Sequence, residues 1–479
     1  MNGKYEAVIG LEVHAQLSTT SKLFCGDSTT FGAEPNTHVS PITLGHPGTL
    51  PRVNKKAVEY AVKMGLACGC EIEKKNWFAR KNYFYPDLPK GYQISQHTTP
   101  ICKGGSIKIK SGDGERSVRL NRIHLEEDAG KSIHDIDDRY TCIDLNRAGT
   151  PLIEIVTEPD IYSAEEAWQY VTEIRKLVRW LNICDGNMEE GSLRCDANVS
   201  IRLKGETRLG TKVEVKNLNS IRNVKKAIEF EIDRMIAEVE AGNSIKQQTR
   251  SFDAATDTTF AIRDKEEAND YRYFPDPDLP ALVLSESYIQ AIQNALPELP
   301  AVLIHQYQQQ YGLSLYDAAQ LCEDKAMVAY FSKVIQHTSS YKALANWMLG
   351  PIRQYLNEHA LDFEQFRLQP QQLAALILLV ESGQVSFSVA ATRVLPVIAE
   401  SNEAPMAIAE KLQLLQVSDA SELEKWVDEA LTSMPEKVAE YKKGKKGLIG
   451  LFVGDVKKRS KGKADPKLVT QLLETKLNN

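Results

Sequence analysis

The chain has 479 residues and a mass of 53.6 kDa, a length at which we expect two to four domains. Its 42% hydrophobic and 25% charged residues are ordinary for a globular protein, and a net charge of −6 excludes neither nucleic acid nor an acidic partner. The longest apolar run, residues 373–380, is too short to span a membrane, and the N-terminus lacks a signal-peptide pattern. Because the eight cysteines are scattered, they indicate a reducing compartment, and we expect a cytoplasmic protein.

The first part of the chain is rich in predicted strands. Alternating and β-branched residues predict strands at residues 5–17, 106–109, 117–127, 152–157, 193–203 and 212–215. Two helices are expected between them. Ser163, with Glu166 three residues later, is a capping-box pattern ahead of the first helix, and helical spacing predicts the second at residues 223–241.

Residues 275–300 are rich in proline and separate the strand-rich part of the chain from a part in which almost all residues have helical spacing. A second interruption falls at residues 401–405. We therefore predict the α+β class, with a mixed-sheet domain at residues 1–295, a helical linker domain at 296–403 and a small helical tail domain at 404–479.

Several predicted strands carry an unusually rich polar face. Strand alternation puts Glu12, His14 and Gln16 on one face of the first strand, Asp196 with its polar neighbours on another, and Glu214 and Lys216 on a third. A face that is merely solvated would explain any one of these strands. Glu154, however, interrupts a strand apolar enough to be buried, where an unpaired carboxylate is costly unless a cation neutralises it.

An acidic segment at residues 122–131 adds candidate ligands. Consecutive Glu126 and Glu127 on a strand point to opposite faces, so we expect at least one of them to face a positive charge. A hard cation such as Mg²⁺, held by one or two carboxylates plus water and phosphate oxygens, suits this chemistry. A solvated acidic turn is equally compatible with the segment alone.

Two basic segments suggest contacts with phosphate. In residues 80–96 the basic side chains of Arg80, Lys81 and Lys90 alternate with aromatic rings. This pattern suits contact with phosphates and bases. It equally suits a loop that packs on the sheet and keeps its lysines at the surface. Residues 442–467 contain ten Lys or Arg and two Asp around an apolar helix. For this second segment an RNA partner is favoured over an idle, solvated helix end.

Some familiar catalytic patterns are absent from the sequence. It has no GxxxxGK[ST] phosphate loop and no GxGxxG dinucleotide turn, which argues against a P-loop or Rossmann nucleotide site. It also has no GxSxG elbow and no cysteine-nucleophile signature. If ammonia is made from glutamine, another polypeptide must make it.

Taken together, many long strings in the chain resemble one known family, the B subunits of the aspartyl/glutamyl-tRNA amidotransferases. The strings extend from residue 5 to near the C-terminus: YEAVIGLEVHAQL, FGAEPN, RKNYFYPDLPKGYQISQ, HLEEDAGKS, DLNRAGTPLIEIVTEPD, MEEGSLRCDANVS, EVKNLNS, DYRYFPDPDLP and GLIGLFVGDVKKRSKGKADP. The resemblance implies a cradle-shaped α+β domain, a helical domain and a YqeY-like tail.

The resemblance also implies an activity and partners. The enzyme would be a heterotrimeric ligase in which an amidase (A) subunit releases ammonia from glutamine and a small C subunit supports the assembly. The chain itself would bind Glu-tRNA(Gln) or Asp-tRNA(Asn), phosphorylate its side-chain carboxylate with ATP and Mg²⁺, and allow ammonia to displace the phosphate.

The expected site residues form four groups, of which the first two carry over from the family residue by residue. The expected Mg²⁺ ligands are His14, Glu127 and Glu154. The expected pocket residues are Glu12, Lys81, Glu126 and Asp196, and the expected ATP contacts are Arg80, Lys81, Glu214 and Lys216. The expected tRNA contacts are Lys442, Lys443, Lys445, Lys446, Lys457, Lys458, Arg459, Lys461 and Lys463.

The sequence departs from the family at one metal site. Many family members carry a zinc site made of two pairs of cysteines, but here only Cys25 remains, with Asp27, Ser40 and Thr43 at the other positions. Because one thiolate cannot hold a structural zinc, we predict no zinc there.

Two other hypotheses compete with this one. A non-catalytic tRNA-binding scaffold of the same complex would explain the basic segments, but it gives His14, Glu127 and Glu154 no function. A stand-alone metal-dependent nuclease or hydrolase would use the same carboxylates without a partner and without ATP.

Overall fold

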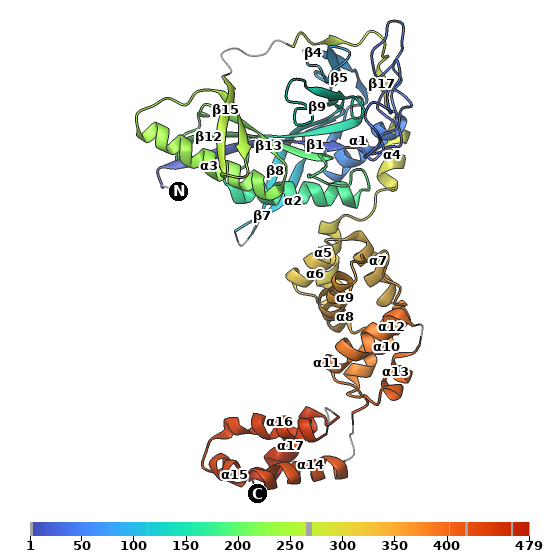
Figure 1. Cartoon of the computed structure of the whole chain (residues 1–479), viewed down its shortest axis with the longest axis vertical. Helices are drawn as coiled ribbons and strands as arrows, with labels where there is room; N and C mark the ends of the chain where they lie inside the picture. The colour runs from blue at the N-terminus through green and yellow to red at the C-terminus, as the bar shows by residue number, and fades with distance from the viewer. Residues whose placement is uncertain are drawn as a thin grey trace. The chain divides into compact units, whose positions relative to one another are not determined.

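The structure is a computed structural model that describes residues 3–112, 114–264, 271–401, 403–416, 420–460 and 463–478. The chain forms two compact units, Met1–Pro297 and Glu298–Asn479. The first contains a large mixed sheet with helices and the second is helical (Figure 1), which confirms the predicted α+β class. The predicted domain limits at residues 295 and 403 stay predictions.

The first unit is built on a sheet of thirteen strands among the described residues. Ten strands follow one another across it in the order β15-β14-β13-β12-β1-β11-β8-β5-β4-β16, and β2, β6 and β7 pair at its side. The bounds in that order are Thr258–Asp264, Gln248–Asp253, Val213–Leu218, Leu193–Leu203, Tyr5–Gln16, Pro151–Thr157, Gly114–Glu127, Tyr92–Ser95, Ala79–Asn82 and Phe274–Pro275, then Glu71–Ile72, Cys102–Lys103 and Ser106–Ser111. Two small sheets pair β9 (Lys131–Ile133) with β10 (Cys142–Asp144) and β3 (Lys75–Asn76) with β17 (Leu282–Val283).

Strand β1 lies at the centre of this sheet, between β11 and β12. Its apolar residues Leu11, Val13 and Ala15 are buried, whereas Glu12 and His14 are half-buried on the other face. Strand β1 therefore has the polar and apolar faces that the sequence predicts. Its neighbours pair with it in antiparallel register, and in the described part of the main sheet only the β13–β14 pair is parallel.

Helices α2 (Ala164–Trp180) and α3 (Ile221–Glu240) lie side by side against the sheet (Figure 1). Helix α2 begins at Ser163, whose Oγ accepts from the Glu166 amide at 3.1 Å. The predicted capping box is only half formed, because the Glu166 carboxylate accepts from the Tyr162 amide and pairs with Arg116 instead of closing on Ser163. Helices α1 (Lys55–Ala67) and α4 (Glu286–Asn294) contact each other elsewhere in the unit.

The second unit contains only helices among its described residues. Its helices α5 to α13, with the π-helical turns η1 and η2, are Pro300–Tyr311, Leu315–Leu321, Lys325–Val334, Tyr341–Trp347, Met348–Ile352 (η1), Arg353–Glu358, Pro370–Glu381, Phe387–Val389, Ala390–Val394 (η2), Leu395–Glu400 and Pro405–Lys411. The tail helices α14 to α17, with the 3-10 turn η3, are Ala420–Ser433, Pro435–Lys442, Lys446–Leu448 (η3), Ile449–Arg459 and Pro466–Asn478.

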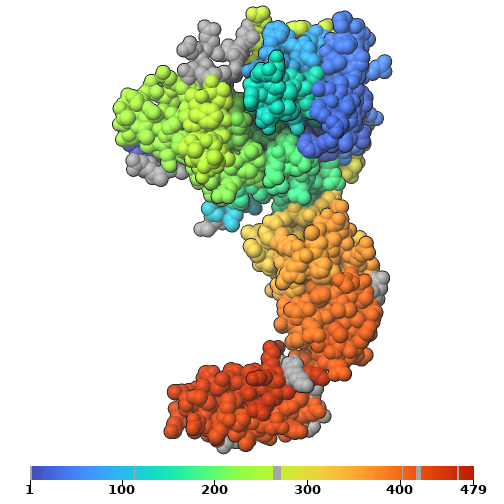
Figure 2. Space-filling view, viewed as in Figure 1, coloured from blue at the N-terminus to red at the C-terminus, as the bar shows by residue number. Residues whose placement is uncertain are grey.

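The tail helices share a hydrophobic core of their own, centred on Val427, Phe452, Val456 and Leu473. They appear as one compact body in the space-filling view, coloured red (Figure 2). In the part of the chain that the structure describes, no helix is both long and apolar enough to cross a membrane.

Candidate functional site

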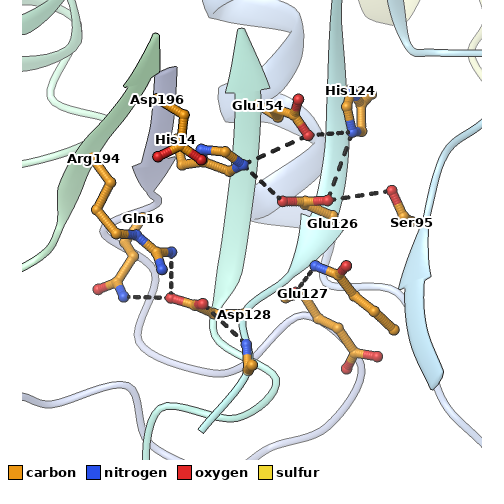
Figure 3. A network of polar contacts seen from close by, with 12 residues as sticks. His14, Gln16, Ser95, His124, Glu126, Glu127, Asp128, Glu154, Arg194 and Asp196 are labelled. Atoms are coloured by element: carbon orange, nitrogen blue, oxygen red, sulfur yellow. Dashed lines mark hydrogen bonds and ion pairs between the residues drawn. The ribbon is translucent and has the colours of Figure 1, made fainter. Parts of the chain in front are cut away.

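Four ionisable side chains meet on the polar face of three neighbouring strands. In the antiparallel register, His14 of β1 lies opposite Glu154 of β11, and Glu154 lies opposite His124 of β8. Glu126 lies two residues beyond His124 and so shares its face. Figure 3 shows the four side chains converging, and we call them the central cluster.

The two imidazoles share the two carboxylates of the central cluster. His14 Nε2 lies 3.6 Å from Glu126 Oε1 and 3.6 Å from Glu154 Oε2. His124 Nε2 lies 3.1 Å from Glu154 Oε2 and 3.7 Å from Glu126 Oε2. One nitrogen of His14 and one oxygen from each carboxylate lie within 4.8 Å of one another, a spacing at which a single metal ion could bind all three.

The electrostatics of the central cluster follow from burial and from these contacts. Burial alone would raise the pKa of Glu154, but the nearby imidazoles of His124 and His14 outweigh it and hold that pKa well below its usual value. Burial alone would lower the pKa of His124, but Glu154 and Glu126 outweigh it and raise the pKa to about 9. The two carboxylates thus favour positive charge at this site, and in the structure the two imidazoles supply it.

Glu127 does not join the central cluster. Its carboxylate forms an ion pair with Lys90 and accepts from the Ile94 amide at 2.8 Å. It lines a separate cavity of about 160 Å³ together with Phe24 and Tyr92. The physical reason is the pleat of β8, which sends Glu126 and Glu127 in opposite directions. The structure therefore groups Glu126, and not Glu127, with His14 and Glu154.

Beside the central cluster lies a second acidic group, formed by Glu12, Asp196 and Glu214. Glu12 and Asp196 are cross-strand partners on β1 and β12. Lys216 Nζ lies 2.5 Å from Asp196 Oδ2 and 3.1 Å from Glu214 Oε1, so a lysine already neutralises part of this charge. The burial of Lys216 is outweighed by Asp196 and Glu214, so its pKa is raised above its usual value.

Lys81 and Arg80 follow each other on β4 but have different surroundings. Lys81 lies near the central cluster, and the attraction of Glu126, Tyr273 and Glu154 raises its pKa although burial opposes this shift. Arg80 instead pairs with Asp276 at 2.9 Å and Asp278 at 2.8 Å. Of the predicted ATP contacts on this strand, Lys81 therefore lies near the central cluster while Arg80 is held in ion pairs.

Asp128 anchors the end of β8 to its neighbours. Its carboxylate accepts from Arg194 at 2.7 Å and from Gln16 at 2.8 Å (Figure 3). It also lies 3.7 Å from Arg147. Burial alone would raise its pKa, but Arg194 and Arg147 hold the pKa below its usual value. These contacts join β8, β1 and β12 just beyond the central cluster.

The four positions of the family's zinc site also lie together. Asp27 Oδ2 accepts from the Ser40 amide at 2.8 Å and from Thr43 Oγ1 at 2.5 Å. Thr43 Oγ1 lies 3.4 Å from Cys25 Sγ. Direct hydrogen bonds thus connect the two loops, and we call these four residues the loop clasp.

The basic residues of the tail lie on and around α15 and α16. Lys442, Lys443, Lys457 and Lys458 are exposed. Others have partners, since Lys445 pairs with Glu440 and Arg459 with Asp455. Lys446 and Lys463 belong to the same segment, and the predicted contact Lys461 lies outside the described residues.

The sequence patterns identified most of this site and placed His124 in the acidic segment at residues 122–131, but they assigned it no role. Its position two residues before Glu126 on a predicted strand was the available signal. The structure places His124 closer to Glu154 than His14 is.

Comparisons with known proteins identify the family of the chain. The family described as the GatB/GatE catalytic domain matches residues 7–290, and the GatB domain matches residues 329–477. Proteins named as B subunits of aspartyl/glutamyl-tRNA(Asn/Gln) amidotransferases are similar to the chain over nearly their whole length.

Three of these relatives show how far the similarity extends. The protein from Thermodesulfovibrio yellowstonii is 50% identical over 98% of both chains. The protein from Synechococcus sp. (strain JA-3-3Ab) is 48% identical over 99% of this chain and 98% of its own. The protein from Geobacter sulfurreducens is 49% identical over 99% of both chains. This chain therefore belongs to the GatB/GatE family, that of the B subunits of aspartyl/glutamyl-tRNA(Asn/Gln) amidotransferases.

Proposed function

We propose that the chain is the B subunit of a tRNA-dependent amidotransferase and that the central cluster activates the side-chain carboxylate of a misacylated tRNA. The observation that supports this is the meeting of His14, Glu126 and Glu154 beside Lys81. The enzyme is a cytoplasmic ligase that forms a carbon–nitrogen bond with glutamine as amido donor. Its partners are an amidase subunit, a small C subunit, and tRNA(Gln), tRNA(Asn) or both.

The reaction has two steps. In the first, an oxygen of the glutamyl or aspartyl side chain attacks the γ-phosphorus of ATP, the bond from that phosphorus to the β–γ bridging oxygen breaks, and ADP leaves. In the second, ammonia attacks the acyl carbon, the bond from that carbon to the phosphate oxygen breaks, and inorganic phosphate and a proton leave. Phosphoryl transfer of this kind needs positioning and charge neutralisation more than covalent help from the protein.

The donor set of the central cluster suits a divalent cation. Two carboxylate oxygens and an imidazole nitrogen are close enough to share one ion, and carboxylates are ligands that Mg²⁺ accepts. When bound, Mg²⁺ neutralises the negative charge of the phosphates. The imidazole equally suits Mn²⁺, which provides a spectroscopic probe.

The chain's own residues supply the rest of the environment. Lys81 carries a positive charge close to the two carboxylates, where it can attract the transferring phosphoryl group. Lys216 holds Asp196 and Glu214 together beside this site. Asp128 with Arg194 and Gln16 keeps the strands in register, so that the reacting groups meet in a fixed geometry.

The test uses the complex assembled with the amidase and C subunits. We expect His14→Ala and Glu126→Gln to abolish ATP-dependent amidation of Glu-tRNA(Gln) while glutaminase activity continues in the amidase subunit. Full amidation by both variants would overturn the proposal and favour a tRNA-binding scaffold. Phosphodiester cleavage by the isolated chain, without ATP, would favour a metal-dependent nuclease instead.

A further inference from the structure

Two segments of similar sequence meet beside β4. Residues 82–89 read NYFYPDLP and residues 271–280 read YRYFPDPDLP. Although the two segments are far apart in the chain, the Asn82 amide donates to Tyr271 O at 2.9 Å, and the Asn82 side chain donates to Arg272 O at 2.8 Å. Main-chain and side-chain hydrogen bonds therefore hold the two segments together.

Each segment places a tyrosine ring against the Lys81 ammonium. Lys81 Nζ lies 4.9 Å from the centre of the Tyr271 ring and 5.8 Å from the centre of the Tyr83 ring. The two ring centres are 6.1 Å apart, with an angle of 69° between the ring planes. An ammonium group within about 6 Å of a ring centre is attracted by the negative face of the ring. We call Tyr83 and Tyr271 the tyrosine pair.

The surroundings of Lys81 differ from those of two other lysines near the acidic residues. Lys216 Nζ lies 2.5 Å from Asp196 Oδ2, and Lys90 pairs with Glu127. Among the described residues, Lys81 forms no ion pair with a carboxylate. An aromatic ring attracts a cation without neutralising it, because the ring has no net charge. The tyrosine pair therefore holds Lys81 and leaves its positive charge available to an anion.

The register of the sheet places Lys81 on the same face as the central cluster. Lys81 of β4 lies opposite Gln93 of β5, and Ser95 of β5 lies opposite Glu126 of β8. Residues directly opposite each other share a face, as do residues two apart on one strand. On this face Ser95 Oγ donates to Glu126 Oε2 at 3.4 Å (Figure 3). Lys81 is therefore two strand spacings from Glu126, about 10 Å between backbones, and both side chains lie on one side of the sheet.

The Tyr271 ring is held from both sides. Arg272, the next residue, has φ +45°, a conformation that is costly for a residue other than glycine. The hydrogen bond from Asn82 to the Arg272 carbonyl supports this conformation. On the other side, the Tyr271 ring contacts the Tyr273 ring at 6.0 Å, and Tyr273 stacks on His97 at 3.9 Å. These contacts fix the orientation of Tyr271.

We propose that Tyr271, together with Tyr83, is a positioning residue that directs the Lys81 ammonium toward the phosphoryl group transferred at the central cluster. A positive charge that is already in place stabilises a transition state without the cost of reorganisation. Tyr271 acts through Lys81 and does not itself touch the substrate. This inference rests on the proposed function, since it assigns a role within that reaction.

The first experiment measures kcat and the KM for ATP in the amidation of Glu-tRNA(Gln) by the whole complex. We expect Tyr271→Leu to lower kcat about ten-fold and to leave this KM unchanged, because the loss falls on the transition state. Tyr271→Phe, which retains the ring, should keep kcat within about two-fold of the wild type. Unchanged kcat in Tyr271→Leu, or equal losses in the two variants, would refute the proposal. A raised KM for ATP at unchanged kcat would make the ring a nucleotide contact and also refute it.

Phe274→Leu is the matched control. Phe274 belongs to the same segment, and its ring centre lies 5.9 Å from the guanidinium carbon of Arg80, so its removal should leave kcat unchanged. A loss in this control as large as that in Tyr271→Leu would point to a general disturbance of the segment and contradict the positioning role. Should Tyr271→Leu fail to fold, Tyr83→Leu removes the other ring, and an unchanged kcat in that variant would refute the proposal.

A second measurement does not depend on activity. Reductive methylation of the full chain with ¹³C-formaldehyde labels the lysine amines, and Lys81→Met identifies the signal of Lys81. Because aromatic rings shift the resonances of groups that lie over their faces, we expect an upfield-shifted Lys81 signal in the wild type and in Tyr271→Phe. This shift should diminish in Tyr271→Leu, and an unshifted wild-type signal would refute the ring contact. If the wild-type complex does not amidate Glu-tRNA(Gln), the proposed function fails even where the shift shows that the rings hold Lys81.

Discussion

Glu126 and Glu127 are consecutive residues of β8, yet their carboxylates lie in different environments. Glu126 lies 3.6 Å from His14 Nε2, whereas Glu127 pairs with Lys90 and accepts from the Ile94 amide. The alternation of a strand causes this separation. The two glutamates, which are chemically identical, therefore have different contacts, and substitution can distinguish their effects.

The first prediction concerns metal binding. We expect Glu126→Gln to weaken Mn²⁺ binding by at least about ten-fold, because a neutral amide replaces one of two carboxylates in the central cluster. Glu127→Gln should leave Mn²⁺ affinity unchanged. Titration followed by electron paramagnetic resonance would measure both. Equal losses in the two variants would show that Glu127 moves into the cluster when metal binds.

The second prediction concerns stability at the same pair of residues. Lys90 and Glu127 are both largely buried, with side-chain exposures of 10% and 4%. Glu127→Gln leaves the Lys90 charge without its partner, and breaking a buried pair in this way costs about 3 kcal/mol. Urea unfolding should show a clearly lower midpoint for Glu127→Gln than for the wild type. A midpoint equal to that of the wild type would contradict the loss.

The third prediction concerns His124. Its Nε2 lies 3.1 Å from Glu154 Oε2, so the imidazole orients a carboxylate of the proposed metal site. Loss of such an orienting partner typically weakens metal binding by about 10- to 100-fold. We expect His124→Ala to show a loss in that range by Mn²⁺ titration, while His124→Gln, which retains a hydrogen-bond donor, recovers part of it. Wild-type affinity in His124→Ala would exclude this role.

The fourth prediction concerns pH and the loop clasp. Partial burial would raise the pKa of Asp27, but hydrogen bonds from Thr43, Ser40 and Cys25 outweigh it and hold the pKa below its usual value. The ionised form therefore stabilises the fold above the unfolded pKa, and that contribution is lost as pH falls through the lower folded pKa. We expect Asp27→Asn to destabilise the protein at neutral pH by about 1 kcal/mol. The difference in unfolding free energy between the two proteins should shrink as pH falls below the usual aspartate pKa, and a constant difference would argue against the ionised carboxylate.

The fifth prediction concerns zinc at the loop clasp. Wild-type protein should contain no stoichiometric zinc by elemental analysis, because Cys25 is the only thiolate at this position. Since the four side chains already lie together, the triple variant Asp27→Cys, Ser40→Cys and Thr43→Cys should bind one zinc ion per chain. Stoichiometric zinc in the wild type would overturn the predicted absence.

The sequence by itself determined which residues are polar on each strand, because alternation depends only on neighbours along the chain. Alternation selects His14 and Asp196, whereas Glu154 stands out as a carboxylate in an apolar strand, and the structure places each of them beside other polar groups. Alternation also required Glu126 and Glu127 to separate. It could not decide which of them faces His14.

Only the tertiary structure decided that question. The choice depends on how β8 pairs with β11 and β11 with β1, and the central strand β1 is separated from the other two by long stretches of sequence. A shift of one residue in either register would exchange the faces of Glu126 and Glu127. The pairing of Glu127 with Lys90 likewise depends on chain folding, because no local pattern specifies which distant groups will meet.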